Sequence, residues 1–149
     1  MKPLVVLLAV FGITLAAIKL SVDDWNYTLS GNIAMSAMLL FTASGHFIFS
    51  KGMAMMMPEF IPFKKQMVYI TGLIELAAAL GLSIPETRHL TGILLIIFFI
   101  FIIPANINAA MKSIDYQKAD YAGRGKNYLW FRVPLQILFI AWVWWFSVR

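Results

Sequence analysis

Glu75 is the residue with the clearest chemical potential, because it is an acid in the middle of an apolar run. The run covers residues 67–83, and no other long apolar segment contains an Asp or Glu. A charged side chain at the centre of a bilayer costs about 2–3 kcal/mol even on lenient insertion scales, so it rarely stays there without a partner or a task. Glu75 therefore marks a candidate ion-pair, proton or ligand site.

Other polar residues fall within the apolar segments near the same predicted end. His46, Asn106 and Arg132 lie about 6–8 Å inside their segments, at a helical rise of about 1.5 Å per residue. Glu75 and Gln136 lie about 14 Å inside on the same scale. We therefore expect these side chains, from four different segments, to converge in one half of a helical bundle.

The neighbours of Glu75 along its own helix are small or weakly polar. Thr71, Gly72, Ala78 and Ala79 occupy the positions three and four residues away, which share one helical face with Glu75. Small residues allow helices to approach closely in lipid. This face is predicted to point into the bundle, with Thr71 as a member of the candidate site.

Two interpretations of these polar residues remain open. A Glu75–Arg132 pair could only orient the helices, with Gln136 and Asn106 as interhelical hydrogen-bonding groups. The alternative is a ligand or proton site that includes Glu75. His46 fits either a proton carrier or an interfacial cap, and Arg132 could extend its charge to the membrane surface.

Several chemistries are disfavoured by the residue inventory. Cysteine is absent, and the only histidines, His46 and His89, are expected at opposite membrane faces, so a bis-histidine haem is not expected. The methionines of residues 53–57 predict a packing surface rather than a copper site. No metal-ligand spacing or glycine-rich phosphate loop is present, and we predict no metal site.

The elements that position these residues are long apolar helices. Of 149 residues, 61% are hydrophobic and 13% are charged, against roughly a quarter charged in soluble domains. Most of the five apolar stretches approach or exceed the ~17–25 residues that cross a bilayer. The stretches are residues 3–20, 29–49, 67–82, 89–110 and 128–147. One all-α, integral membrane domain over residues 1–149 is predicted.

Charge placement predicts an orientation for this domain. The net charge is +5, and most basic residues fall in the loops over residues 51–65 and 111–127. The positive-inside rule then places both loops in the cytoplasm, with five spans, the N-terminus inside and the C-terminus outside. Such loops serve topology and contact with the lipid bilayer, so a nucleic-acid partner is not expected. Residues 3–20 are expected to stay as an anchor rather than be cleaved as a signal.

Prolines and short polar stretches predict where the helices are interrupted. The short stretch 51–65 contains Pro58 and Pro62 and is too short to span, so it predicts a half-buried or re-entrant segment. Residues 83–88 predict a tight turn between two antiparallel helices. Pro104 is expected to bend the fourth segment, because its ring leaves the carbonyl four residues earlier without a donor.

Four motifs in order resemble the DoxX-like family of small bacterial membrane proteins. They are Gly-His-Phe at residues 45–47, Gly-Leu-Ile-Glu at 72–75, Pro-Ala-Asn-Ile at 104–107 and Arg-Val-Pro-Leu-Gln at 132–136. The resemblance covers roughly residues 29–146. It implies a four-helix core over residues 29–147, an additional N-terminal transmembrane helix over residues 3–20, and the bacterial cytoplasmic (inner) membrane as location.

The resemblance implies function only at the level of classes. We favour an intramembrane polar pocket that binds a small lipophilic molecule. One alternative is a membrane subunit of a quinone-linked oxidoreductase, in which Glu75 and His46 handle protons, quinone is the cofactor and a redox partner subunit supplies electrons. The other alternative is a structural membrane anchor for a partner protein. Autonomous catalysis is not expected, because no electron-carrying ligand set is present.

Overall fold

Helices make up most of the structure, a computed structural model that describes residues 2–149. Within these residues no β-strand is formed, apart from an isolated bridge between Asp115 and Asp120. The α-helices are α1 (Lys2–Val22), α2 (Tyr27–Ile48), α3 (Ser50–Met56), α4 (Lys64–Ser83), α5 (Pro85–Phe101), α6 (Ile103–Met111) and α7 (Leu129–Val143). A 3-10 turn, η1 (Lys126–Tyr128), precedes α7, and a π-helical turn, η2 (Trp144–Val148), follows it. The predicted all-α class is confirmed.

Within residues 2–149, five helical segments are long and apolar enough to cross a membrane. They are α1, α2, α4, the run Pro85–Met111 formed by α5 and α6, and the run Lys126–Val148 that contains α7. Each overlaps one of the five apolar stretches expected from hydropathy. Local composition therefore predicts both the number and the place of these long helices.

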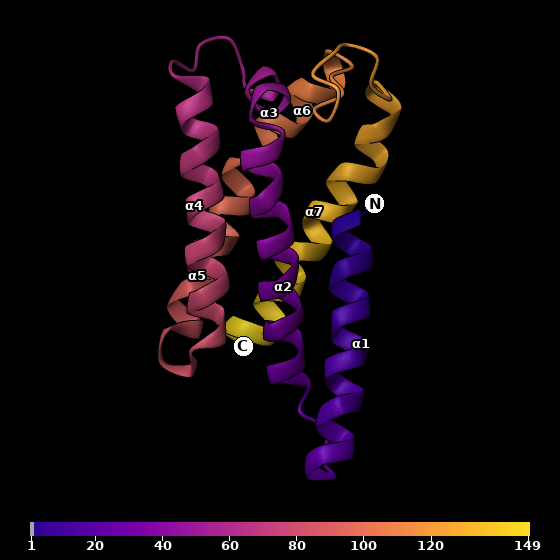
Figure 1. Cartoon of the computed structure of the whole chain (residues 1–149), viewed down its shortest axis with the longest axis vertical. Coiled ribbons are helices and arrows are strands. Elements are labelled where there is room, and N and C mark those ends of the chain that lie inside the picture. The colour runs from indigo at the N-terminus through magenta and orange to yellow at the C-terminus, as the bar shows by residue number, and fades with distance from the viewer. Residues whose placement is uncertain (1) are drawn as a thin grey trace.

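Helix α2 lies in the middle of the bundle, between α4 and α1 (Figure 1). Helix α1 is displaced along α2, so that its C-terminal end projects beyond the turn between α4 and α5 (Figure 1). Helices α4 and α5 form the predicted antiparallel hairpin. Hydrogen bonds from Thr87 Oγ1 to the Gly81 carbonyl (2.9 Å) and from Arg88 Nε to the Leu82 carbonyl (3.2 Å) hold its turn.

The largest apolar core joins α1, α2, α4, α5 and α7 in the half of the bundle nearer the α4–α5 turn. It contains the fully buried Met35, Met38 and Leu39 of α2 and Leu82 of α4. Helix α1 contributes the buried Leu7. This core holds the helices on both sides of α2 and leaves the other half of the α2–α4 interface for polar side chains.

The break expected at Pro104 lies between α5 and α6. Helix α5 ends at Phe101, and α6 begins at Ile103 with Pro104 in its first turn. The backbone N–H of Ile102 closes α5 by donating to the Phe98 carbonyl at 3.1 Å. Pro104 has no N–H to donate to the Ile100 carbonyl four residues earlier. The proline therefore allows one apolar segment to form two helices.

The methionine-rich segment forms the short helix α3, which packs against α4 and α6. Met56 is buried in a small cluster with Ala109 and Ile114. Together with α6 and the loop before α7, α3 closes the end of the bundle opposite the α4–α5 turn (Figure 1). The segment is thus partly buried within the bundle, and its helix of seven residues is too short to span a membrane.

Candidate functional site

The Glu75 carboxyl is buried between α4 and α2, where its two contacts both come from α2. Thr42 Oγ1 donates a hydrogen bond to Oε2 at 2.8 Å. His46 Nε2 lies 3.4 Å from Oε1. Glu75 therefore forms an acid–imidazole pair with His46, supported by a threonine hydroxyl.

The second nitrogen of His46 is held by the first turns of α4. His46 Nδ1 lies 3.1 Å from the Val68 carbonyl oxygen and 3.0 Å from Thr71 Oγ1. Thr71 Oγ1 donates its own proton to the same carbonyl at 2.8 Å. A carbonyl only accepts, so these contacts place a proton on Nδ1 and leave Nε2 to share a proton with Glu75.

A proton between Glu75 and His46 can lie on either residue. Either the neutral Glu75 carboxyl donates to Nε2, or the imidazolium donates from Nε2 to the carboxylate. Both arrangements keep the pair at net charge zero, which reduces the cost of burying it between the helices. The proton can thus move between Glu75 and His46 without a change of net charge, and the pair can exchange a hydrogen bond with a ligand.

Small residues on α4 allow α2 to approach closely enough for these contacts. A Cβ at Gly72 would lie 2.9 Å from the Cβ of His46, closer than packed side chains allow. Gly72, Ala78 and Ala79 are buried together with Glu75, as expected from their shared helical face. The predicted inward orientation of this face is therefore confirmed.

The imidazole is the more accessible end of the pair. The side chain of His46 is 16% exposed and that of Glu75 is 7% exposed. Next to them, Phe47 and Tyr69 stack at 5.9 Å between ring centroids, and Phe47 is itself exposed. A molecule approaching this side of the bundle would thus meet an aromatic surface beside His46.

The other candidate residues lie elsewhere in the bundle. Gln136 Nε2 donates to the Phe99 carbonyl at 3.1 Å, which ties α7 to α5. Arg132 lies over the rings of Tyr116 and Tyr128, with its guanidinium carbon 5.9 and 5.4 Å from their centroids.

The structure thus corrects the expected convergence of all these residues on Glu75. Within residues 2–149, no ion pair or hydrogen bond joins Glu75 to Arg132, Gln136 or Asn106. The reason is the choice of neighbours: Glu75 faces α2, whereas α7 packs chiefly on α5, α6 and the terminal turns. Similar depth in a bundle does not make two side chains adjacent.

Sequence reasoning missed Thr42, which completes the pair. Its position four residues before His46 is the signal that could have revealed it, because this spacing puts both side chains on one face of α2. It also missed Asn32, which is buried farther along α2 and bonds to η2. We call Thr42, His46, Thr71 and Glu75 the polar cluster.

Comparison with known proteins identifies a family but no activity. A family model described as "Domain of unknown function (DUF8561)" matches residues 35–147. The match includes the whole polar cluster and does not include α1. No curated protein and no solved structure matches the chain.

Proposed function

This chain belongs to the DUF8561 family, and we propose that it is a multi-pass membrane protein that binds a small lipophilic molecule at the Glu75–His46 pair. The hydrocarbon part of the molecule would lie along the apolar helix surfaces. Its polar group would exchange hydrogen bonds with the imidazole and the carboxyl. The observation that carries the proposal is the pairing of a buried acid with a titratable, partly exposed partner.

The nature of that partner separates a ligand site from a structural ion pair. Among residues 2–149, no Lys or Arg pairs with Glu75, so the carboxyl has no permanent cation beside it. Buried charges that only orient helices are usually paired and fully enclosed. Here the pair can rearrange its proton, and the His46 edge is open to an incoming donor or acceptor.

A quinone-linked role is the second candidate, and the geometry of His46 favours it specifically. A quinone oxygen needs hydrogen-bond donors, which the imidazole and the protonated carboxyl provide. A bound quinone would supply the electron-accepting chemistry. The chain itself would orient the ring and deliver protons through His46, whose Nδ1 side leads to Thr71 and the Val68 carbonyl.

The resemblance of the motifs to the DoxX-like family supports both candidates. On the same basis we propose the bacterial cytoplasmic membrane as the location. Both basic loops lie at one end of the bundle, which supports placing that end in the cytoplasm. The orientation that we propose with it has the N-terminus inside and the C-terminus outside. Cysteine labelling of residue 118 in intact cells tests this orientation: reaction with an impermeant reagent would overturn it.

The ligand proposal is tested by comparing three purified proteins: wild type, Glu75→Gln and Glu86→Gln. Glu86 is a matched control, because it is an acid in the exposed first turn of α5. Mass spectrometry of co-extracted lipids and quinones should detect a ligand in wild type and Glu86→Gln. Its content should fall about tenfold in Glu75→Gln, as expected when a charge-assisted hydrogen bond is lost.

A fourth protein, His46→Gln, separates the two candidate roles. If the pair only binds, ligand content should fall in this variant as in Glu75→Gln. If the pair delivers protons, ligand content should persist while quinone reduction with the partner present is lost. Unchanged ligand content and unchanged activity in both variants would leave only the anchor role.

A further inference from the structure

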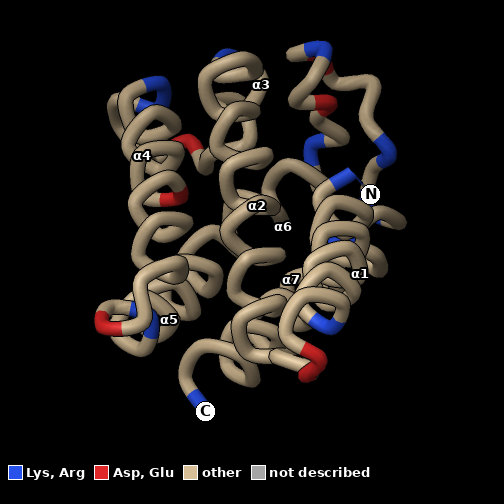
Figure 2. The backbone as a smooth tube through the Cα atoms, turned by 60° about the horizontal axis from the view of Figure 1, so that its bottom comes forward, with Lys and Arg blue, Asp and Glu red and all other residues tan. Residues whose placement is uncertain are grey.

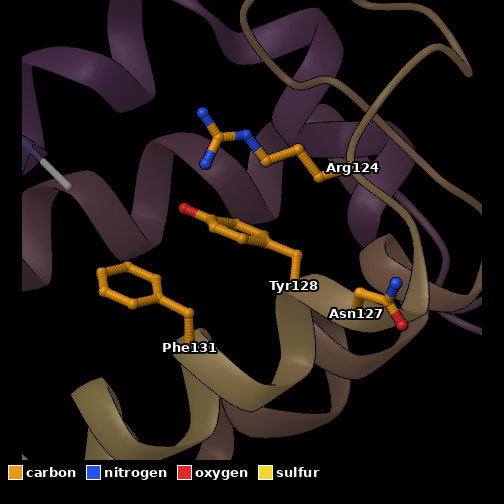
Figure 3. Close-up of a pocket in the computed structure, with 4 residues that line it drawn as sticks. All are labelled: Arg124, Asn127, Tyr128 and Phe131. Atoms are coloured by element: carbon orange, nitrogen blue, oxygen red, sulfur yellow. The ribbon is translucent and has the colours of Figure 1, made fainter.

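Arg124 and Arg132 gather around one aromatic ring at the start of α7. The guanidinium carbon of Arg124 lies 5.6 Å from the Tyr128 ring centroid, and that of Arg132 lies 5.4 Å from it. Phe131 stacks on the same ring at 5.7 Å. Figure 3 shows the Arg124 guanidinium beside the phenol end of Tyr128, with Phe131 on the other side and Asn127 pointing away.

Neither arginine is paired with an acid among residues 2–149. The acids of the neighbouring loops are already engaged. Glu59 pairs with Lys112, Asp115 accepts from backbone N–H groups of the 117–118 turn, and Asp120 accepts from the N–H of Ala122. The two guanidinium groups therefore keep their capacity to bind an external anion.

The surrounding end of the bundle is strongly basic. Among residues 2–149, eight basic residues lie in or beside the loops at this end, with three acids. The basic ones are Lys51, Lys64, Lys65, Lys112, Lys118, Arg124, Lys126 and Arg132, and the acids are Glu59, Asp115 and Asp120. At the opposite end the charges balance, with Lys19, Arg88 and Arg149 against Asp23, Asp24 and Glu86. The electrostatic field at the end of the bundle where α7 begins therefore attracts anions.

Arg124, Asn127, Tyr128 and Phe131 line a pocket of about 310 Å³. We propose that this pocket, with Arg132 beside it, binds the phosphate group of an anionic phospholipid. Arginine holds phosphate through two parallel N–H bonds, and the Tyr128 ring attracts both guanidinium groups by cation–π contact. Trp130, which precedes Phe131 in the sequence and is 87% exposed, is the kind of residue found at headgroup level.

A second pocket at this end, of about 320 Å³, is less suited to the role. It is lined in part by Lys64 and Lys112. Lys112 is bound to Glu59, and Lys64 Nζ donates to the Met57 carbonyl. An anion there would have to displace an existing partner, whereas the arginine pocket offers free donors.

The proposal is tested by titrating phosphatidylglycerol or phosphatidylcholine into detergent-solubilised protein and counting bound lipids by native mass spectrometry. Wild type should bind phosphatidylglycerol in preference to phosphatidylcholine. Arg124→Gln and Arg132→Gln should each weaken phosphatidylglycerol binding about tenfold, the equivalent of one charge-assisted hydrogen bond. Arg132→Lys should be intermediate, because it keeps the charge but loses the planar fork.

Lys51→Gln is the charge-matched control, an exposed residue of α3 at the same end. An equal loss in Lys51→Gln would reduce the effect to general charge and overturn the site. Unchanged affinity in Arg124→Gln would also overturn it, and this variant removes only an exposed loop side chain. Competition by inorganic phosphate or glycerol phosphate as strong as that by the lipid would identify a site for small anions instead.

Discussion

Replacing Asn32 with leucine should detach the C-terminal turn η2 from α2. Asn32 is fully buried, and its Nδ2 donates to the Phe146 carbonyl at 2.7 Å as well as to Thr28 in its own helix. Its Oδ1 accepts from Ser147 Oγ at 2.7 Å. One side chain thus joins residues more than a hundred positions apart.

The expected loss follows from these contacts. Two interhelical hydrogen bonds disappear, and in membranes each contributes about 0.6–1.7 kcal/mol. The Phe146 carbonyl and the Ser147 hydroxyl then lose a partner in an apolar region, which adds about 1 kcal/mol or more. We expect Asn32→Leu to lower the free energy of unfolding by about 2–4 kcal/mol. The bond from Trp142 Nε1 to the Gly31 carbonyl remains and should keep α7 near α2.

The assay is unfolding by sodium dodecyl sulfate in mild-detergent micelles, followed by far-ultraviolet circular dichroism and tryptophan emission. Ser30→Ala is the matched control. Ser30 is equally buried on α2, but its hydroxyl donates only to the Asn26 carbonyl four residues earlier and does not join two helices. Amide exchange should accelerate in η2 of Asn32→Leu and not in Ser30→Ala. Equal unfolding free energies for the two variants would refute the reasoning.

Two further changes test the loops at the basic end. Gly52→Ala should displace the loop before α7, because the new Cβ would overlap the Tyr116 carbonyl oxygen, and proteolysis of this loop should become several-fold faster. Gly12→Ala is the control and should leave proteolysis unchanged, because nothing lies within 4 Å of its new Cβ. The hydrogen bond from Lys112 lowers the pKa of Glu59 below its ordinary 4.5, so the pair's contribution to stability is complete above pH 4.5 and is lost as the pH falls through the lowered pKa. Acid-unfolding curves of wild type and Lys112→Gln should therefore differ slightly above pH 4.5 and converge below the lowered pKa of Glu59. Added salt should reduce the difference. Curves that separate only at low pH would contradict the Glu59–Lys112 assignment.

The long helices were predictable from the sequence because their cause is local. Twenty or so apolar residues in succession favour a helix that satisfies its own backbone in lipid, whatever its neighbours. The break at Pro104 and the turn before Pro85 follow from the backbone restrictions of single residues. The inward face of α4 was equally predictable from the sequence, since helical spacing places Gly72, Ala78 and Ala79 beside Glu75.

The partners of the polar residues were not predictable in the same way. Depth along a helix follows from counting residues, and by depth alone Arg132 and Gln136 matched Glu75 as well as His46 did. The structure pairs Glu75 with His46 and Thr42 because α4 packs against α2, whereas Arg132 meets the rings of Tyr116 in the loop and Tyr128 in η1.

The sequence by itself determined that this chain consists of apolar helices with one acid in their interior. It also determined the small-residue face on which that acid lies, because composition and helical periodicity are properties of a single segment. Only the tertiary structure decided that the acid meets an imidazole and a hydroxyl rather than a guanidinium. That choice depends on how several helices pack together. Because all of these helices are similarly apolar, apolarity alone does not determine which helix packs against which.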